Sequence, residues 1–175
     1  MKPLALITSC VIGTLSLSAH ASTSEDLAQI LRFGLPAAAA ATSWAKDDSE
    51  GLWQFGISFA ASSATALALK SSVDAERPDG SSNDSFPSGH ATNTFAAASY
   101  LQQRYGWEYG VPAYALASWT AVSRVNTDHH RWGDVLAGAA LGMAFSYWLV
   151  DPYSPVQLTP LIGKDSVMLT GSIRF

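Results

Sequence analysis

Cysteine is almost absent from this sequence, with Cys10 as its single example in 175 residues. That residue lies in an apolar N-terminal segment of the kind that is removed from secreted proteins. A chain without that segment has no cysteine at all. Disulfide bonds, zinc–thiolate sites and cysteine nucleophiles are then excluded from the mature protein.

Charge is also scarce. Asp, Glu, Lys and Arg make up 14% of the residues, whereas about a quarter is usual for a soluble domain. Apolar residues make up 48%, and the mean hydropathy is slightly positive. Either the helices are deeply buried or the protein sits in or on a membrane. The net charge of −4 and the lack of any basic run argue against nucleic acid as a partner.

The N-terminus has the pattern of a secretory signal peptide. A lysine precedes a mostly apolar stretch over residues 4–17, and Ala19-His20-Ala21 fits a small-residue cleavage site. We therefore predict a leader over residues 1–21. One alternative is that this segment stays attached as a first membrane helix. A lipoprotein site at Cys10 is a weaker alternative, because the apolar run continues beyond that residue.

Five apolar segments between residues 22 and 150 have helical length, which predicts an all-α bundle of about five helices. They are Leu27–Lys46, Gly51–Lys70, Ser88–Arg104, Val111–Arg124 and Asp134–Val150. Only Gly51–Leu69 approaches the ~20 apolar residues that cross a bilayer. Gly138 and Gly142 share one helix face and permit a close helix contact, with or without a membrane.

The tail over residues 151–175 changes character. Gly163-Lys164-Asp165 is typical of a turn, and apolar and polar residues alternate from Val167 to Phe175. This predicts a small C-terminal β-hairpin that caps the helices. The last strand of an outer-membrane barrel would end in a similar way, but such a barrel needs about eight strands or more.

Three clusters of chemically useful residues lie where predicted helices meet polar loops. They are Lys70 with Arg77-Pro78, then Pro87-Ser88-Gly89-His90, and then Ser123-Arg124 with His130 and Asp134. Each cluster alone has an ordinary explanation, such as a helix end, a turn or a helix cap. Together they supply what a phosphate site needs: cations for the oxygens, backbone N–H groups at a helix start, a nucleophile and an acid.

The spacing of His130 and Asp134 separates the candidate nucleophiles. Positions four apart lie on one helix face, so Asp134 can accept a hydrogen bond from one ring nitrogen of His130. That bond would fix the tautomer and leave the other nitrogen free to attack. His129 is the rival nucleophile, but it lacks this spacing and is expected to shape the pocket or face solvent.

In this order, Lys70-x6-Arg77-Pro78, Pro87-Ser88-Gly89-His90 and Ser123-Arg124-x5-His130-x3-Asp134 resemble the signature of the type 2 phosphatidic acid phosphatase (PAP2) superfamily. That superfamily also contains bacterial acid phosphatases and vanadium haloperoxidases. The resemblance implies roles for eight residues. His130 would attack and carry the phosphoryl group, Asp134 would orient it, and His90 would protonate the leaving group and then activate water; Lys70, Arg77, Ser88, the Gly89 amide and Arg124 would bind phosphate oxygens. It implies no metal or other cofactor.

The resulting hypothesis is a phosphohydrolase that acts through a phosphohistidine on a lipid phosphate or lipid diphosphate of the cell envelope. Undecaprenyl diphosphate, phosphatidylglycerophosphate, phosphatidic acid and lipid A all fit. Few lysines or arginines lie in the loops that would be cytoplasmic in a fully membrane-embedded topology. We therefore favour a cleaved protein of the cell envelope, soluble or membrane-associated, whose site faces the periplasm.

Three alternatives remain. A soluble periplasmic acid phosphatase of broad specificity has the same motifs. A vanadium haloperoxidase is disfavoured by the small size of the chain. A structural envelope protein is disfavoured because every residue type that phosphoryl transfer needs is present.

Overall fold

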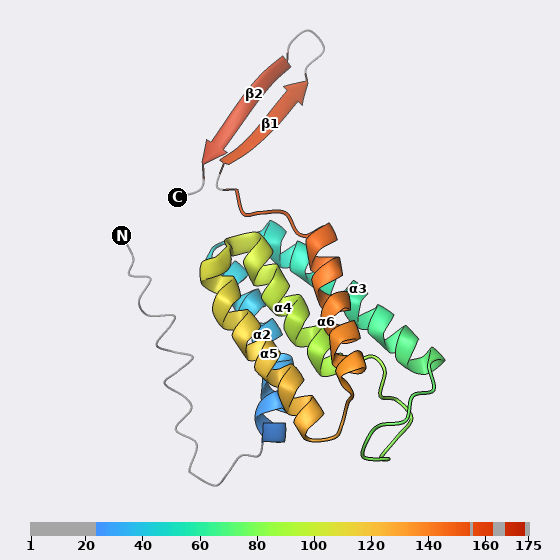
Figure 1. Cartoon of the computed structure of the whole chain (residues 1–175). Helices are drawn as coiled ribbons and strands as arrows, with labels where there is room; N and C mark the ends of the chain where they lie inside the picture. Colours follow the sequence, from blue (N-terminus) through green and yellow to red (C-terminus); the bar gives the residue numbers. More distant parts are fainter. Residues whose placement is uncertain (1–23, 155, 163–166, 174–175) are drawn as a thin grey trace.

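The computed structural model describes residues 24–154, 156–162 and 167–173 (Figure 1). The predicted leader over residues 1–21, with Cys10, lies outside the described residues. Five helices follow one another along the described chain: α2 (Ser24–Ala45), α3 (Ser49–Ser72), α4 (Gly89–Tyr105), α5 (Trp107–Asn126) and α6 (Trp132–Leu149). The predicted bundle of five helices is confirmed.

Four helices, α2, α3, α5 and α6, start earlier than the sequence pattern predicted, and two of these starts have a clear local cause. Helix α5 begins at Trp107 rather than Val111, because Gly106 takes a φ of 88° and turns the chain directly from α4 into α5. Helix α6 begins at Trp132 rather than Asp134. The Asp134 carboxylate accepts a hydrogen bond from the Arg131 backbone N–H at 2.8 Å, so it caps the helix from inside its first turn.

Helix α4 is the centre of the bundle and packs against each of the other four helices. Its buried face is built largely from small residues, among them Ala91, Ala96, Ala97 and Ala98. Small side chains let neighbouring backbones approach closely. The N-terminus of α4, which carries the Pro-Ser-Gly-His cluster, is thereby held in the middle of one end of the bundle (Figure 1).

The closest helix contact joins α4 to α6. A Cβ atom at Gly142 would lie 2.6 Å from both the Ala96 nitrogen and the Thr92 carbonyl oxygen. A Cβ atom at Gly138 would press against the Ser88 carbonyl oxygen and Thr92. The predicted close contact through these two glycines is therefore confirmed, and it positions the start of α4 directly against α6.

The opposite end of the bundle is closed by a buried ion pair. The Arg104 Nε and Nη2 atoms each donate to the Asp48 carboxylate at 2.7 Å, and Asp48 also accepts from the Gly51 N–H and the Tyr105 hydroxyl. Arg104 Nη1 donates to the Asp151 carbonyl oxygen at 3.0 Å. This cluster joins the α2–α3 turn to the end of α4 and to the chain that leaves α6.

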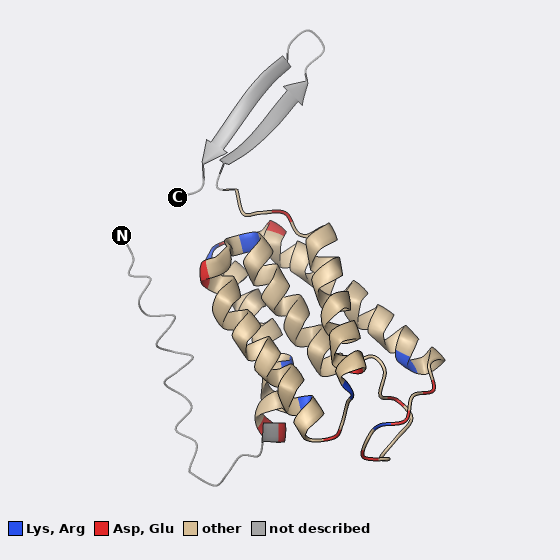
Figure 2. Ribbon diagram, viewed as in Figure 1, with Lys and Arg blue, Asp and Glu red and all other residues tan. Residues whose placement is uncertain are grey.

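The sides of the bundle are apolar on the outside as well. Figure 2 shows that charged residues gather at the two ends, with few between them. Five of the exposed large aromatic side chains stand at the ends of helices far from the α4 N-terminus: Trp44, Trp53, Trp107, Tyr147 and Trp148. Trp132, at the start of α6 beside the site, is exposed as well, as are Phe33 and Trp119. Of the helices that the structure describes, α3 alone has the length and hydropathy to cross a membrane.

Two strands follow the helices. Strands β1 (Val156–Ile162) and β2 (Val167–Ile173) pair antiparallel, with Val156 opposite Ile173 and Ile162 opposite Val167. The predicted turn at Gly163-Lys164-Asp165 and the terminal Phe175 lie outside the described residues. The predicted hairpin and its packing on the helices therefore stay a prediction.

Candidate active site

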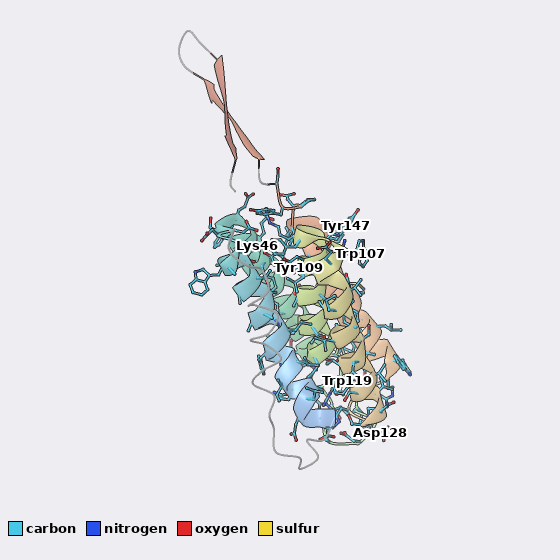
Figure 3. The ribbon with its side chains drawn as sticks, turned by 90° about the vertical axis from the view of Figure 1, so that its left-hand side faces the viewer. Lys46, Trp107, Tyr109, Trp119, Asp128 and Tyr147 are labelled. Carbon is cyan, nitrogen blue, oxygen red and sulfur yellow. The ribbon has the colours of Figure 1, made fainter. Side chains whose placement is uncertain are left out.

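The residues of all three clusters meet at one end of the bundle (Figure 1). Helices α3 and α5 end there, helices α4 and α6 start there, and the two connecting segments, 73–88 and 127–131, cross the same end. Each predicted site residue comes from one of these parts: Lys70 from α3, Arg77 and Ser88 from the first segment, Gly89 and His90 from α4, Arg124 from α5, His130 from the second segment and Asp134 from α6. Figure 3 places Asp128, in the second segment, at the end opposite Lys46 and Tyr109.

The first connecting segment brings Lys70 and Arg77 together around Asp84. The Arg77 Nε and Nη2 atoms both lie 2.9 Å from Asp84 Oδ1. Lys70 donates to the Asp84 carbonyl oxygen and lies 3.7 Å from its carboxylate. These ion pairs hold both cations in place without a ligand. Sequence reasoning gave Asp84 no role, and an arriving phosphate would compete with its carboxylate.

The second cluster forms the first turn of α4. Ser88 is fully buried, and its hydroxyl faces the Ala91 N–H at 3.5 Å as the helix N-cap. The Ser88 N–H donates to the Asp134 carbonyl oxygen at 2.9 Å, which ties this turn to α6. The turn therefore presents the α4 N-terminus, the favourable end of the helix dipole for an anion, at the centre of the site.

His130 is buried among these groups. Its side chain is 3% exposed, and its Nδ1 atom lies 3.8 Å from Asp134 Oδ2. This distance is too long for the predicted direct hydrogen bond. Ser85 lies beside both groups: its hydroxyl donates to Asp134 Oδ2 at 2.6 Å and lies 3.4 Å from His130 Nδ1. No motif had singled out Ser85, because it stands alone between two clusters.

The surroundings of His130 favour its neutral form. Burial, followed by the charges of Arg77, Lys70 and Arg124, lowers its pKa to about 4, and Asp134 only partly opposes this shift. A neutral imidazole has a lone pair that can attack an electrophile. Because Ser85 and Asp134 lie on the Nδ1 side, the free nitrogen is Nε2.

His90 stands on another side of the site and contacts helix α2. Its Nε2 atom lies 2.9 Å from Gln29 Oε1. Burial, and then the charges of Arg124 and Arg32, lower its pKa to about 3. Gln29 and Arg32 were missed by the sequence reasoning, since they belong to no motif. Their spacing, one helical turn apart after the acidic first turn of α2 and within its mostly apolar remainder, was the available signal.

His129 points away from Asp134. Its Nδ1 atom contacts the Thr127 carbonyl oxygen at 2.8 Å and lies 3.7 Å from Glu25 Oε1. The geometry therefore places His130, and not His129, beside the carboxylate. Among the residues that the structure describes, no group of three His, Cys, Asp or Glu side chains is arranged to hold a metal ion.

Fold and site together define a class: a helical-bundle enzyme that gathers cations and two buried histidines around a helix N-terminus, residue types that suit phosphoryl transfer. The family model of the PAP2 superfamily matches residues 51–154. This protein belongs to the PAP2 superfamily, and it is a phosphatase.

The proteins that are similar to this chain include two lipid A phosphatases and one solved structure. The lipid A 4'-phosphatase of Helicobacter pylori is 31% identical over 164 residues, which cover 86% of this chain and 81% of that protein. The lipid A 1-phosphatase of Porphyromonas gingivalis is 42% identical over 82 residues, 43% of this chain and 18% of that protein. A transmembrane PAP2-type phosphatidylglycerolphosphate phosphatase from Bacillus subtilis has the same fold, with a TM-score of 0.58 at 22% identity over 72% of this chain and 74% of that one.

Proposed function

We propose that this protein removes a phosphate group from a lipid phosphate through a phosphohistidine at His130. One observation carries the proposal: a buried, neutral histidine lies among three cations and beside an acceptor that can orient it. The lipid part is supported by similarity to the lipid A 4'-phosphatase and by the exposed apolar sides of the bundle.

In the first half of the reaction, His130 Nε2 attacks phosphorus and the bond to the leaving oxygen breaks. Lys70, Arg77 and Arg124 neutralise the phosphate oxygens, with the Gly89 N–H as a further donor. The imidazolium that forms on His130 is stabilised by Asp134 and Ser85. The leaving oxygen takes a proton from His90.

In the second half, His90 removes a proton from water, which attacks the phosphohistidine. Inorganic phosphate leaves and neutral His130 is restored. Burial and the charges of Arg124 and Arg32 lower the pKa of His90 to about 3, so His90 must gain its proton when the substrate binds. A phosphate dianion beside the imidazole raises the His90 pKa, because an opposite charge favours the protonated form.

We further infer that the protein associates with a membrane in the cell envelope. The uncharged sides of the bundle suit contact with lipid, and tryptophan and tyrosine are enriched where proteins meet the membrane–water interface. Such aromatic side chains stand at both ends: Figure 3 marks Trp107 and Tyr147 at the end far from the site, and the exposed Trp132 starts α6 beside the site. The leader expected over residues 1–21 favours a site that faces the periplasm.

The first experiment measures phosphate release from long-chain lipid phosphates and from small soluble esters, with wild type, His130→Ala and His129→Ala. We expect wild type to prefer the lipids, His130→Ala to lose at least about 10³-fold in kcat, and His129→Ala to retain most activity. An acid-labile, base-stable phosphoenzyme should disappear only in His130→Ala. Persistence of that adduct would assign the nucleophile elsewhere, and equal turnover of small esters would favour the soluble acid phosphatase.

A further inference from the structure

Helix α2 adds a side to the site that none of the three clusters supplies. Gln29 and Arg32 are three positions apart and share one face of α2. Gln29 contacts His90, as described above. The Arg32 Nη2 atom lies 3.8 Å from where a Cβ would stand on Gly89. The guanidinium of Arg32 therefore lies over the first turn of α4, next to the helix N-terminus that faces the phosphate.

Arg32 is half-buried, with its guanidinium 5.2 Å from the centroid of the Phe33 ring. Its Nε atom is buried without a hydrogen bond, and so is the Nε atom of Arg124. Within the part of the chain that the structure describes, no carboxylate oxygen lies at ion-pair distance from either side chain, whereas Lys70 and Arg77 are both paired with Asp84. Unpaired buried donors are unfavourable, so two such arginines at one site indicate a place for an anion.

The two unpaired arginines, Arg32 and Arg124, differ in which histidine they influence. Arg77, Lys70 and Arg124 are the cations that act most strongly on His130. Arg124 and Arg32 are those that act most strongly on His90. Arg124 is thus shared, and Arg32 lies on the His90 side. The proposed function, on which this step rests, assigns the leaving group to that side, because His90 protonates the leaving oxygen.

We propose that Arg32 binds a leaving group that is itself negatively charged, in particular the second phosphate of a diphosphate substrate. A phosphate at that position would accept from the Arg32 guanidinium, including the Nε–H that now has no partner. A substrate with an uncharged leaving group would leave Arg32 without an anion. Arg32 thereby distinguishes diphosphates from monophosphates, while the three motif cations bind the scissile phosphate in both.

The test compares binding of inorganic diphosphate and inorganic phosphate by calorimetry, in wild type, Arg32→Gln and Arg32→Lys. Lys46→Gln is the matched control, since it removes a cation that directly follows the C-terminal end of α2, far from the site (Figure 3). We expect wild type to bind diphosphate more tightly than phosphate. Arg32→Gln should weaken diphosphate binding about 10- to 100-fold and phosphate binding by less than about threefold. Arg32→Lys should recover part of the loss, and Lys46→Gln should match wild type.

The same variants are then assayed on one prenyl chain carrying either one or two phosphates. The ratio of kcat/KM values should move towards the monophosphate in Arg32→Gln. Equal losses of affinity for both ligands in Arg32→Gln would show that Arg32 binds any phosphate or acts structurally. No loss of affinity would show that Arg32 does not contact the ligand. Either result would overturn the proposal. Failure of wild type to hydrolyse any substrate would overturn the proposed function alone, because the binding comparison does not depend on turnover.

Discussion

At the scale of single residues, the most informative contact is the one between Ser85 and Asp134. The Asp134 carboxylate accepts from the Ser85 hydroxyl at 2.6 Å and from the Arg131 N–H at 2.8 Å, while His130 Nδ1 stays 3.8 Å away. The carboxylate is therefore fixed before it meets the histidine. A small movement of the imidazole towards Asp134 would complete the pair when His130 gains positive charge.

This arrangement predicts a graded effect of two substitutions on turnover. Asp134→Asn should lower kcat by about 10³-fold, because the developing imidazolium loses its counter-charge and its orienting acceptor. Ser85→Ala should lower kcat by only about 10-fold, since the Arg131 N–H still holds the carboxylate. Steady-state kinetics on one substrate checks both values. A Ser85→Ala loss as large as that of Asp134→Asn would mean that Ser85 contacts the reacting groups itself.

The depressed histidine pKa values predict how stability depends on pH. His130 has a pKa of about 4 in the fold, against an ordinary value of 6.5. Between these values the unfolded chain binds a proton that the folded chain does not, so the free energy of unfolding falls as the pH is lowered from about 6.5 to 4. His90 acts in the same direction and extends the window to about 3.

Chemical denaturation at a series of pH values measures this dependence. In His130→Asn the fall in the free energy of unfolding between pH 6.5 and 4 should be shallower than in wild type. Carboxylates with lowered pKa values, such as Asp48, change the free energy of unfolding mainly below their ordinary pKa of 3.8. They therefore contribute little to its pH dependence between pH 6.5 and 4. A His130→Asn curve parallel to the wild-type curve would contradict the lowered pKa.

At the scale of elements, the α4–α6 contact determines where the phosphate-binding turn lies. Gly142→Ala places a methyl group 2.6 Å from the α4 backbone, which must move, and should lower the free energy of unfolding by about 1–3 kcal/mol. Gly56→Ala is the control, because a Cβ there meets nothing within 4 Å and α3 gains helix propensity. Urea denaturation compares the two, and equal stabilities would show that α4 and α6 can separate freely.

At the scale of the whole molecule, the two ends of the bundle differ in how their charged side chains are paired. The site end holds two arginines, Arg32 and Arg124, whose Nε atoms have no hydrogen-bond partner, whereas the buried charges Asp48 and Arg104 at the far end pair with each other. Asp48 is 2% exposed and Arg104 5%, and they form a two-pronged ion pair with further donors around it. Removing either partner of this pair would therefore leave a buried charge without its counter-charge, far from the site.

This division predicts that breaking the far pair damages the fold rather than the chemistry. Asp48→Asn leaves Arg104 buried without its counter-charge and should lower the free energy of unfolding by about 3–5 kcal/mol. Asp74→Asn, an exposed carboxylate, should change it by less than about 0.5 kcal/mol. The specific activity of folded Asp48→Asn, measured well below its melting temperature, should stay within about twofold of wild type.

The sequence by itself determined the five helices, the α4–α6 glycine contact and the cluster residues that gather at one end. These features depend on local information: apolar runs of helical length, glycines four apart, and charged or histidine residues where helices meet polar loops. Apolar periodicity also made Leu27–Lys46 a helix, but it could not show which of its faces meets the site.

Only the tertiary structure decided the parts played by Gln29, Arg32, Ser85 and Asp84. Each reaches the site through packing between segments far apart in the sequence, as when α2 brings Gln29 to within 2.9 Å of His90, 61 positions later. The distance from His130 to Asp134 was decided in the same way. The two residues have the right spacing, but the α3–α4 segment places the Ser85 hydroxyl beside both of their side chains. Spacing along one helix cannot predict that position. Sequence spacing constrains neighbours within an element, whereas contacts between elements depend on how the whole core packs.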